Sequence, residues 1–596
     1  MRRFPPTLSV RPPPPPPMYR YNAHDRRQLT QRARQFRGQV RRFRAGALDP
    51  DVFQQLRLRN GLYKERHAHM LRVAIPYGVL NSRQLQRLAT VARRFDRGYG
   101  HFTTRQNIQF NWPELDQVPA ILEALAEVGM HAIQTSGSCV RNITADHLAG
   151  VAADEIEDPR PWCELIRQWS TLHPEFNWLP RKFKIAVTGA HADRAAVQWH
   201  DIGLRLFHDG AGQTRFRVLV GGGMGRIPVI GQVIAESLAA DDLLGFLQAI
   251  LRVYNRYGRR DHKYRSRIKI LVGDLGIDEF RERVEKEWRD MMNADAAPTV
   301  SAADIEQARA FFAPATTAND GDDVATGDDV ASGDGKNTGR LQPIPVADSR
   351  FLRWREHNTV AHRDPAYRIV YVSLKAPGRA PGDLNAAQMD ALAKLAKTYS
   401  ADEIRVSHEQ NLVLPFVRRA DLFAVWHELN RIELATPNIG TLNDMICCPG
   451  LDYCSLANAG TIGIARQINE RIAGLDRLYD IGEVKLKMSG CMNACGHHHA
   501  GHIGILGVDK KGAEWYQITL GGSADNDTRL GARLGPAIAR AQVAEVVETI
   551  IDAYIELRLD GEKFLDTVIR LGVEPFKQKV YAHHQKPRRH SRPLAA

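Results

Sequence analysis

Two closely spaced pairs of cysteines in the last third of the chain are the residues best suited to chemistry. Cys448 and Cys454 enclose five residues in CPGLDYC, and Cys491 and Cys495 enclose three residues in CMNAC. Four thiolates from two loops can hold an iron–sulfur cluster. Structural zinc is the alternative, but zinc knuckles favour CxxC spacing, which both pairs lack. Unliganded buried cysteines would not explain two pairs with flanking Gly and Pro, so a metal cluster is the favoured interpretation.

The remaining residues of this kind are interpreted as bystanders. The chain has seven Cys, and an odd number concentrated in one region favours a reducing compartment over a disulfide framework. Cys447 breaks the required spacing to Cys454, and Cys163 in PWCELI is expected to be a buried helical residue. The HHHAGH run from His497 to His502 is expected to pack around the cluster.

Composition and charge restrict the class of protein. The 596 residues are 43% hydrophobic and 25% charged, which is ordinary globular usage and predicts about three or four folded units. No apolar run of about 18 residues exists, and the N-terminus lacks the apolar segment of a secretory signal. Of the net charge of +13, residues 1–46 carry +11 and residues 577–596 carry +6, which leaves −4 for residues 47–576. A nucleic-acid groove is therefore not indicated.

An internal repeat at a constant offset of 304 residues organises the chain. Each copy is expected to form an apolar strand, a helix, a second strand ending near a QN pair, and another helix. The two α/β modules are expected to pair as a pseudo-twofold unit. Arg105 in the first copy corresponds to Glu409 in the second, so anion chemistry is expected on the first copy's side. The ungapped matches include Asn81 with Asn385, Gln84 with Gln388, Gln106 with Gln410 and Asn107 with Asn411.

The cysteine segments carry a resemblance to a known family. CPGLDYCSLA followed by SGCMNACGHHH resembles the signature of the sulfite and nitrite reductases, and the resemblance covers about residues 18–576. That family holds one four-iron four-sulfur cluster coupled to one siroheme. The resemblance implies Cys448, Cys454, Cys491 and Cys495 as cluster ligands, with Cys495 bridging the cluster and the siroheme iron. Among the branches, the chain is most similar to bacterial assimilatory sulfite reductase haemoprotein subunits.

The resemblance also implies a fold. We expect an α/β (α+β) protein in which a duplicated ferredoxin-like module forms a pseudo-twofold unit beside two larger mixed α/β siroheme and cluster domains. The expected organisation is a disordered Pro-rich extension at 1–17, a basic amphipathic helix at 18–46, ferredoxin-like half-repeats at 47–136 and 341–429, a siroheme and anion-binding domain at 137–313, an acidic disordered linker at 314–340, an iron–sulfur and siroheme domain at 430–576 and a basic tail at 577–596.

Site residues follow from the resemblance and from charge. Siroheme carries eight carboxylates and the substrate is a small anion, so the cavity needs many fixed cations. By similarity, four residues bind the substrate anion and act in catalysis: Arg72, Arg141, Lys182 and Lys184. The siroheme binders implied are Arg105, Arg181, Arg267, Lys269 and Asn493, together with Cys495.

The implied activity is the six-electron reduction of sulfite to sulfide in assimilatory sulfur metabolism. Reduction of nitrite to ammonia uses the same cofactors and is the alternative; a cobalamin-pathway oxygenase and an iron–sulfur sensor or nucleic-acid-binding protein are further rivals. GGGMGR at 221–226 is not GxGxxG, so a nicotinamide site has no support. Electrons are expected from ferredoxin or a separate flavoprotein. We expect a cytoplasmic protein that binds neither nucleic acid nor membrane.

Two further expectations concern individual segments. Some members of the resembled family carry a Tyr-to-Cys thioether at positions that match Tyr63 and Cys139. The alternative is an unlinked Tyr over the cavity and a free buried Cys. The resemblance begins at Met18, directly after the Pro run, so residues 1–17 are expected to be dispensable.

Overall fold

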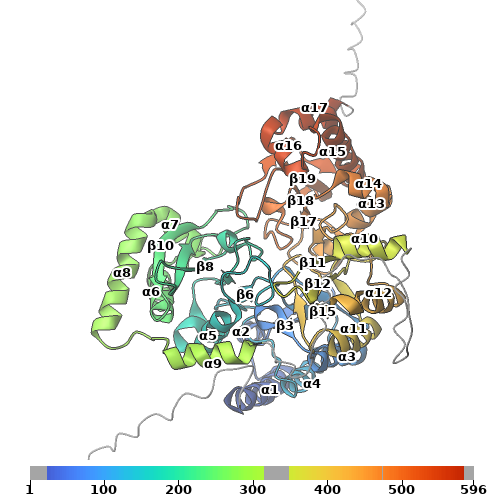
Figure 1. Cartoon of the computed structure of the whole chain (residues 1–596). Helices are drawn as coiled ribbons and strands as arrows, with labels where there is room; N and C mark the ends of the chain where they lie inside the picture. Colours follow the sequence, from blue (N-terminus) through green and yellow to red (C-terminus); the bar gives the residue numbers. More distant parts are fainter. Residues whose placement is uncertain (1–22, 314–347, 473, 583–596) are drawn as a thin grey trace, which may run out of the picture.

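The computed structural model describes residues 23–313, 348–472 and 474–582, which form three lobes (Figure 1). One lobe holds both copies of the repeat, a second holds α5 to α9, and a third holds α13 to α17. The expectations for the extension at 1–17, the linker at 314–340 and the end of the basic tail lie outside the described residues.

Two five-stranded sheets in the first lobe exchange their edge strands. Their orders are β1-β2-β5-β4-β13 and β11-β12-β15-β14-β3, so each sheet ends with a strand from the other copy. This exchange confirms the predicted pseudo-twofold pairing of ferredoxin-like modules. The strands are β1 (Leu62–Lys64), β2 (His69–Val73), β3 (Val79–Leu80), β4 (Tyr99–Phe102), β5 (Ile108–Phe110), β11 (Thr359–Ala361), β12 (Tyr367–Val372), β13 (Asp383–Asn385), β14 (Ile404–Val406) and β15 (Leu412–Arg418).

The repeated helix has the same start in both copies. In α3 (Ser82–Phe95), Asn81 accepts a hydrogen bond from the Gln84 backbone while Gln84 reaches back to the Asn81 N–H. The same capping box opens α11 (Ala386–Tyr399) with Asn385 and Gln388. Such boxes satisfy N–H groups that a helix start leaves without partners. The two helices pack against each other over one shared apolar core.

The QN turns join the two copies. Gln106 and Gln410 both have a left-handed backbone, with φ of 54° and 60°. The Gln106 amide donates to the carbonyl of Val406 in the other copy at 2.9 Å, and Gln410 donates to the carbonyl of Phe102 at 3.1 Å. Phe102 and Val406 are themselves equivalent in the repeat. The contacts are therefore reciprocal, which explains why the QN pair recurs.

The other two lobes are also copies of one another, a relation that the sequence analysis missed. Their sheets have the orders β10-β9-β8-β7-β6 and β16-β17-β18-β19-β20, with β21 also on β19. The first holds β6 (Thr144–Ala145), β7 (Ile185–Thr188), β8 (Ile202–His208), β9 (Thr214–Val220) and β10 (Gln232–Ala239). The second holds β16 (Ile446–Cys447), β17 (Leu486–Ser489), β18 (Ile503–Lys510), β19 (Ala513–Leu520), β20 (Ala532–Arg533) and β21 (Ile538–Ala539).

A glycine loop follows the fourth strand of each copy. Added Cβ atoms on Gly222 and Gly522 would lie 2.3 and 2.4 Å from backbone oxygens, so both loops require glycine. Helices cover the sheets and enclose separate cores. They are α5 (Arg160–Ser170), α6 (Leu243–Tyr257), α7 (Ile268–Leu275), α8 (Ile277–Asn293) and α9 (Ala302–Phe312) in one lobe, and α13 (Ile462–Arg471), α14 (Leu475–Ile481), α15 (Val543–Leu557), α16 (Phe564–Leu571) and α17 (Glu574–Ala582) in the other.

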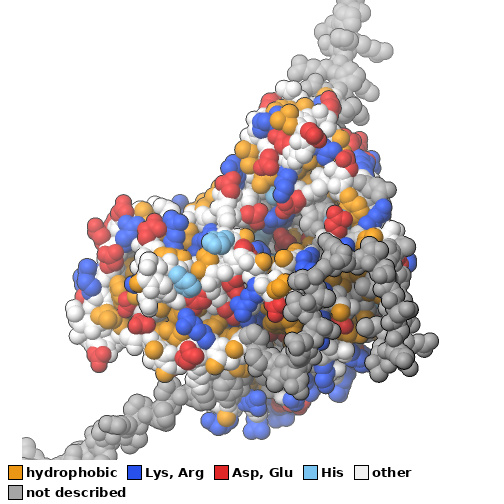
Figure 2. Space-filling view, viewed as in Figure 1, with side chains coloured by type: hydrophobic (Ala, Val, Ile, Leu, Met, Phe, Trp, Pro, Cys, Tyr) orange, Lys and Arg blue, Asp and Glu red, His pale blue; other side chains and the backbone are white. Residues whose placement is uncertain are grey.

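The basic helix at the start of the described chain packs on the protein itself. α1 (Ala23–Arg44) buries Leu29, Ala33, Phe36 and Val40 and contacts α2 (Pro50–Arg59) and α4 (Val118–Ala126). Lys and Arg side chains gather over this edge (Figure 2). The remaining helices of this lobe are α10 (Ser349–Asn358) and α12 (Leu422–Arg431).

The predicted basic tail is wrong for residues 577–582. These residues belong to α17, which buries Phe576 and Val580 against the core of the third lobe. The charge of Lys577 and Lys579 concealed the two apolar residues, which lie four apart and so share one helix face. Among the described residues, no helix is long and apolar enough to cross a membrane.

The reciprocal glutamine contacts should be measurable in stability. Gln106→Ala removes bonds to the backbone of Ala145 and Val406 and leaves those buried groups without partners. We expect a loss of about 2–4 kcal/mol in unfolding free energy, seen as a lower Tm in a thermal melt. Gln86→Ala, on the exposed face of α3, is the matched control and should leave the Tm unchanged. Equal Tm values for the two variants would contradict the role of the QN turns.

Candidate active site

The topology of the third lobe brings the two cysteine pairs together. Cys448 follows β16 and Cys491 follows β17, and these strands are parallel neighbours. The carboxyl ends of parallel neighbours lie at the same edge of a sheet, so the loops that leave them are adjacent. The Cys448 thiol accepts a hydrogen bond from the Gly490 N–H at 3.1 Å, which joins the first pair's loop to the second.

Electrostatics links the four thiols. Burial raises the pKa of Cys448 and Cys491, and raises that of Cys454 to about 12. The charge of Cys495 acts on all three of these thiols. Thiolates at such positions need a cationic partner, which iron supplies when a cluster binds. The donor set therefore fits a metal cluster.

The cysteine thiols do not close around a single ion in the described part of the chain. Four thiolates around one zinc would lie about 3.8 Å apart, given Zn–S bonds of about 2.3 Å in a tetrahedron. Among the described residues, no three Cys, His, Asp or Glu side chains converge closely enough to hold one metal ion. The His497–His502 run forms no such group either.

Cys447 and Cys163 lie apart from this set. Cys447 is a residue of β16 within the apolar core, where burial raises its pKa to about 12, and its N–H donates to Gln410. Cys163 is fully buried in α5.

Seven of the eight cations named from the sequence lie within electrostatic reach of at least one other, and the eighth, Arg72, shares the Thr135 carbonyl with Arg141. Arg267 forms an ion pair with the fully buried Asp201 at 2.6 Å. Arg105 donates to the Asn142 carbonyl at 2.6 Å and to the Thr144 hydroxyl at 2.9 Å. Burial lowers the pKa of Arg105 to about 9. The Lys269 ammonium donates to backbone carbonyls of the 221–227 glycine loop, including that of Met224 at 2.9 Å.

Lys182 and Lys184 flank Phe183, whose backbone bridges to Val140, so the two lysines leave the chain on the same side. Burial, with help from nearby arginines, lowers the pKa of Lys182 to about 7. Burial and then Lys182 itself lower the pKa of Lys184 well below its usual value. The charge of Cys495 acts in the opposite direction and raises the pKa of Lys182. The lysines thus lie within electrostatic reach of the cysteine that the resemblance names as the bridge.

Backbone carbonyls of one loop hold the side chains of two further cations, Arg141 and Arg72. The Arg141 guanidinium donates to the carbonyls of Thr135 and Gly137, both at 2.8 Å. Arg72 donates to the same Thr135 carbonyl at 3.5 Å and lies over the Tyr63 ring at 5.2 Å. The Arg72 Nε is buried and has no hydrogen-bond partner in the described structure. It remains a donor for a bound anion.

In the second copy of the repeat, the region that corresponds to this cationic pocket carries acidic and neutral side chains. Glu409 occupies the place of Arg105, and by strand register Tyr371 occupies the place of Arg72. Asn142 donates to Asn107 at 2.9 Å in the first copy, whereas Asn411 donates to Asp444 at 2.8 Å in the second. Acidic side chains have thus replaced neutral and basic ones.

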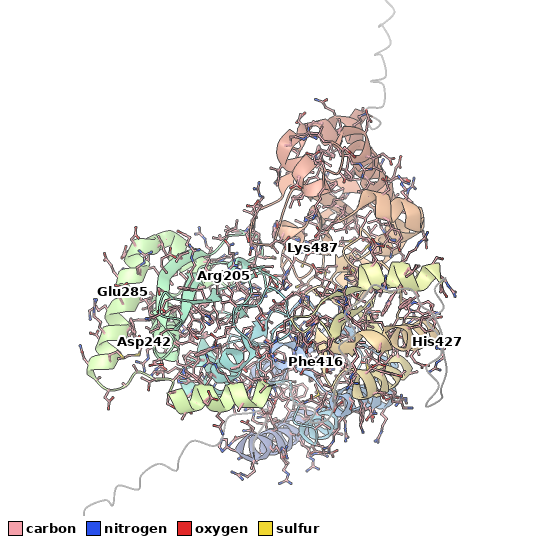
Figure 3. The ribbon with its side chains drawn as sticks, in the orientation of Figure 1. Arg205, Asp242, Glu285, Phe416, His427 and Lys487 are labelled. Carbon is pink, nitrogen blue, oxygen red and sulfur yellow. The ribbon has the colours of Figure 1, made fainter. Side chains whose placement is uncertain are left out.

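Three lysines accompany the acidic residues of the second copy: Lys375, Lys485 and Lys487, the last labelled in Figure 3 at the base of the third lobe. Burial would raise the pKa of Glu409, but these lysines hold it at about 2. Lys375 also forms an ion pair with Asp444 at 2.5 Å. Among the contacts described above, Asp201 is the one acidic side chain that pairs with the cations of the first copy. The excess positive charge therefore lies on the side that Arg105 and Glu409 predicted.

Several residues that build this site were missed in the sequence. Thr104 donates to the Cys495 carbonyl at 2.8 Å and ties the first repeat to the cysteine loop. Asp201 holds both Arg267 and the Lys184 N–H. A Cβ on Gly496 would lie 1.8 Å from the Met488 carbonyl, so the loop needs glycine directly after Cys495. Gly496 could have been predicted from its position directly after Cys495. Thr104 and Asp201 could not, because their roles depend on contacts distant in sequence.

The fold and this site define a redox protein with an anion pocket beside a cluster site. The family model described as "Nitrite and sulphite reductase 4Fe-4S domain" matches residues 136–291 and 440–587. A second, "Nitrite/Sulfite reductase ferredoxin-like half domain", matches residues 63–128 and 362–432. The chain belongs to the nitrite and sulfite reductase family. It is accordingly an oxidoreductase with siroheme and a four-iron four-sulfur cluster, and the predictions of family, fold class and cofactors are confirmed.

Relatives with either substrate in their names are similarly distant. The chain is 26% identical to the chloroplastic ferredoxin–nitrite reductase of Arabidopsis thaliana, over 84% of this chain and 79% of the relative. It is 24% identical to sulfite reductase [ferredoxin] 1 of Mycolicibacterium paratuberculosis, over 85% and 83%. The solved structure of Mycobacterium tuberculosis NirA protein shares the fold, with a TM-score of 0.73, 22% identity and coverage of 94% and 98%.

The cysteine assignment can be tested by substitution. Cys495→Ser should lose the cluster spectrum and the iron, because a hydroxyl is a poor cluster ligand. Cys447→Ala, at the end of strand β16 next to Cys448, is the matched control and should keep both. Absorption spectroscopy and iron analysis of the purified variants provide the readout. Cluster loss in Cys447→Ala with retention in Cys448→Ala would show that the wrong member of the pair was chosen.

The pairing of Tyr63 with Cys139 stays a prediction. The Tyr63 hydroxyl donates to the Thr135 carbonyl at 3.3 Å. The Cys139 thiol donates at 3.2 Å to the carbonyl of Ser136, which follows Thr135 in the chain. Because both groups reach one loop, tryptic mass spectrometry distinguishes the two alternatives: a thioether gives one branched peptide that lacks two hydrogens and resists thiol reductants. Separate recovery of both peptides, with Cys139 freely alkylated, would rule the thioether out.

Proposed function

We propose that this protein reduces sulfite to sulfide. The observation that carries the proposal is the pair Lys182 and Lys184 beside Arg72 and Arg141, in a pocket where cations greatly outnumber carboxylates. Sulfite presents three oxygens and up to two negative charges, whereas nitrite presents two oxygens and one charge. A dianion compensates a pocket with this excess of positive charge better than a monoanion does.

The proposed roles follow from the position of each cation. Arg72 and Arg141, both held at the Thr135 carbonyl, fix the orientation of the anion through planar guanidinium donors. The Lys182 and Lys184 ammonium groups stabilise the negative charge and donate protons as oxygens leave as water. A lysine whose pKa lies near 7 gives up its proton readily at neutral pH.

The remaining cations hold the cofactor in this proposal. Arg105, Arg181, Arg267 and Lys269 are placed to bind siroheme carboxylates, and Asn493 hydrogen-bonds to the Cys491 thiol. When bound, siroheme coupled to the cluster supplies a site for six successive electron transfers to one substrate. Burial of the pocket excludes water from the other side chains and strengthens their charge interactions.

We further propose ferredoxin as the electron donor. The names of the Arabidopsis thaliana and Mycolicibacterium paratuberculosis relatives state a ferredoxin dependence for those proteins. A separate flavoprotein is the second candidate. The cytoplasm is the proposed compartment because clustered cysteines that bind a metal need reducing conditions.

Reduction of nitrite to ammonia is the second candidate function. The comparison that favours it is the Haloferax mediterranei relative, an assimilatory ferredoxin-dependent nitrite reductase that is 27% identical over 85% of this chain. It requires the same number of electrons. Steady-state assays with sulfite and nitrite in parallel, driven by a chemical reductant, distinguish the two; higher kcat/KM for nitrite would overturn the sulfite proposal.

The lysines provide the sharpest variants. Lys182→Ala and Lys184→Ala should each lower kcat/KM for sulfite by about 30- to 150-fold, which corresponds to the loss of about 2–3 kcal/mol from one charge-assisted contact. Lys397→Ala, on the exposed face of α11, is the matched control and should keep wild-type kinetics. Absorption spectra should show full cofactor content in all three. Normal kinetics in both pocket variants would place these lysines outside the reaction.

A further inference from the structure

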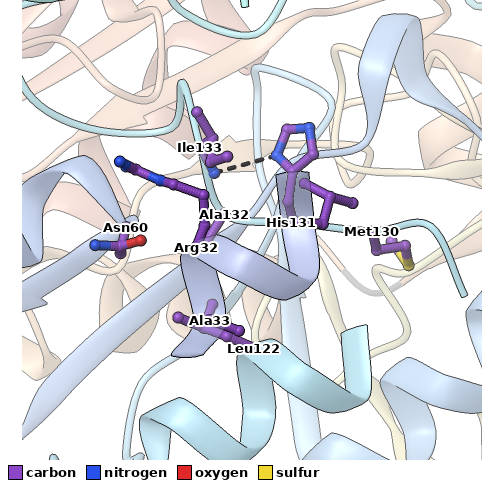
Figure 4. A pocket seen from close by; sticks show the side chains of 9 residues that line it. Arg32, Ala33, Asn60, Leu122, Met130, His131, Ala132 and Ile133 are labelled. Carbon is purple, nitrogen blue, oxygen red and sulfur yellow. Dashed lines mark hydrogen bonds between the residues drawn. The ribbon is translucent and has the colours of Figure 1, made fainter. Parts of the chain in front are cut away.

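A second cationic cavity lies behind the loop that holds Arg141. It has a volume of about 90 Å³. One wall is the loop itself, through Ser136 to Cys139, and the others include Arg32 of α1, Arg59 of α2 and Trp178. A smaller pocket of about 20 Å³ adjoins it and shares Arg32 and Ile133. Figure 4 shows the Arg32 side chain reaching from α1 past Asn60 in this smaller pocket.

The two arginines lack the partners that buried guanidinium groups normally have. Arg32 Nε and Arg59 Nη2 are inaccessible to solvent and bond to nothing in the described structure. Each such donor without an acceptor destabilises the empty cavity. None of the described residues that line the cavity is Asp or Glu. The two guanidinium charges also repel each other. Burial is the main cause that lowers the pKa of Arg32, and the nearby charge of Arg59 lowers it further.

The other walls combine polar and apolar side chains, so the two arginines supply the charge of the cavity. The Arg59 guanidinium lies 4.0 Å from the centre of the Trp178 ring, which fixes its position, and Trp178 is 61% exposed at the mouth. Polar side chains from Gln55, Ser138 and Asn177 also line the cavity, beside the apolar Leu58, Ile133, Val140, Leu172 and Phe176. A space of about 90 Å³ corresponds to about three waters at about 30 Å³ each. This volume accepts a small inorganic oxyanion.

The cavity and the reaction pocket share the 135–141 loop. Arg141 holds the Gly137 carbonyl from the side of the reaction pocket, and Gly137 also lines the cavity. Arg59 of α2 lies within electrostatic reach of Cys139, which belongs to this loop. An anion held by Arg32 and Arg59 would therefore be one loop away from the substrate cations.

We propose that this cavity is a second oxyanion site, in which Arg32 and Arg59 bind sulfite before its transfer to the reaction pocket. The site also binds sulfate, the more oxidised oxyanion of similar size and charge. Binding of the ion satisfies the two free guanidinium donors and offsets their mutual repulsion. The role in transfer rests on the proposed function; the binding itself does not. The site lies outside the set of eight cations assigned to siroheme and substrate.

Sulfate binding to the holoenzyme tests the site. Isothermal titration with sodium sulfate, at constant ionic strength set with potassium chloride, is compared for the wild type, Arg32→Gln, Arg59→Gln and Lys184→Ala. We expect Arg32→Gln and Arg59→Gln to weaken one class of binding by about tenfold or more, while Lys184→Ala leaves that class unchanged. Arg34→Gln, an exposed arginine of α1, is the matched control and should bind as the wild type does.

Further readouts separate the possible failures. Unchanged sulfate affinity in both Arg32→Gln and Arg59→Gln would contradict the proposal that the cavity binds an oxyanion, and would leave water as its occupant. Loss of sulfate binding with an unchanged KM for sulfite would overturn the transfer role, since we expect KM to rise about tenfold while kcat is retained. Thermal melts and siroheme spectra exclude misfolding, and Arg59→Lys should recover part of the affinity because it keeps the charge. If the wild type reduces no sulfite, the proposed function fails while the binding result stands.

Discussion

The structure depends on the burial of many positive charges beside few negative ones. Arginine and lysine side chains gather beside the first copy of the repeat, and the buried carboxylate of Asp201 pairs with Arg267 and acts on Arg105, Lys184 and Lys269. Burial, and then repulsion from neighbouring cations, lowers the pKa values of Arg105, Lys182 and Lys184. An anionic cofactor and an anionic substrate relieve that repulsion. The site is therefore complete only when its ligands are bound.

The duplicated scaffold provides both this pocket and its neutralised counterpart. Exchanged edge strands, the QN turns and the glycine loops fix the two halves in equivalent positions, so a change of residue type in one half alters charge without altering the backbone. Glu409 and Asp444 neutralise lysines on one side, while Arg105 and Asn142 leave the other side positive. One framework thus supports a single reactive centre.

Much of this arrangement could be predicted because it is written in local patterns. The ungapped repeat predicted the helices α3 and α11, and the spacing of four cysteines in two loops predicted a cluster site. The capping boxes of the helices and the sheet edge that the cysteine loops share come from the structure. The cations were named through resemblance, and the structure brings all eight together. The role of each in substrate or siroheme binding stays a proposal.

The parts that could not be predicted depend on contacts distant in sequence. Asp201 is an ordinary residue before a strand until the fold places it against Arg267. The second duplication keeps few identical residues beyond its glycine loops, because its strands are specified by apolar character alone. Arg32 and Arg59 lie in basic helical segments whose charges are mostly exposed, so nothing local distinguishes the two that line a cavity.

The central claim is that this pocket holds siroheme beside a cluster bound by Cys448, Cys454, Cys491 and Cys495. Quantitative iron and acid-labile sulfide analysis of the purified full chain, combined with its absorption spectrum, tests the claim most directly. The account predicts siroheme bands together with iron and sulfide in a ratio of about five to four. A colourless protein that contains zinc and no acid-labile sulfide would contradict it.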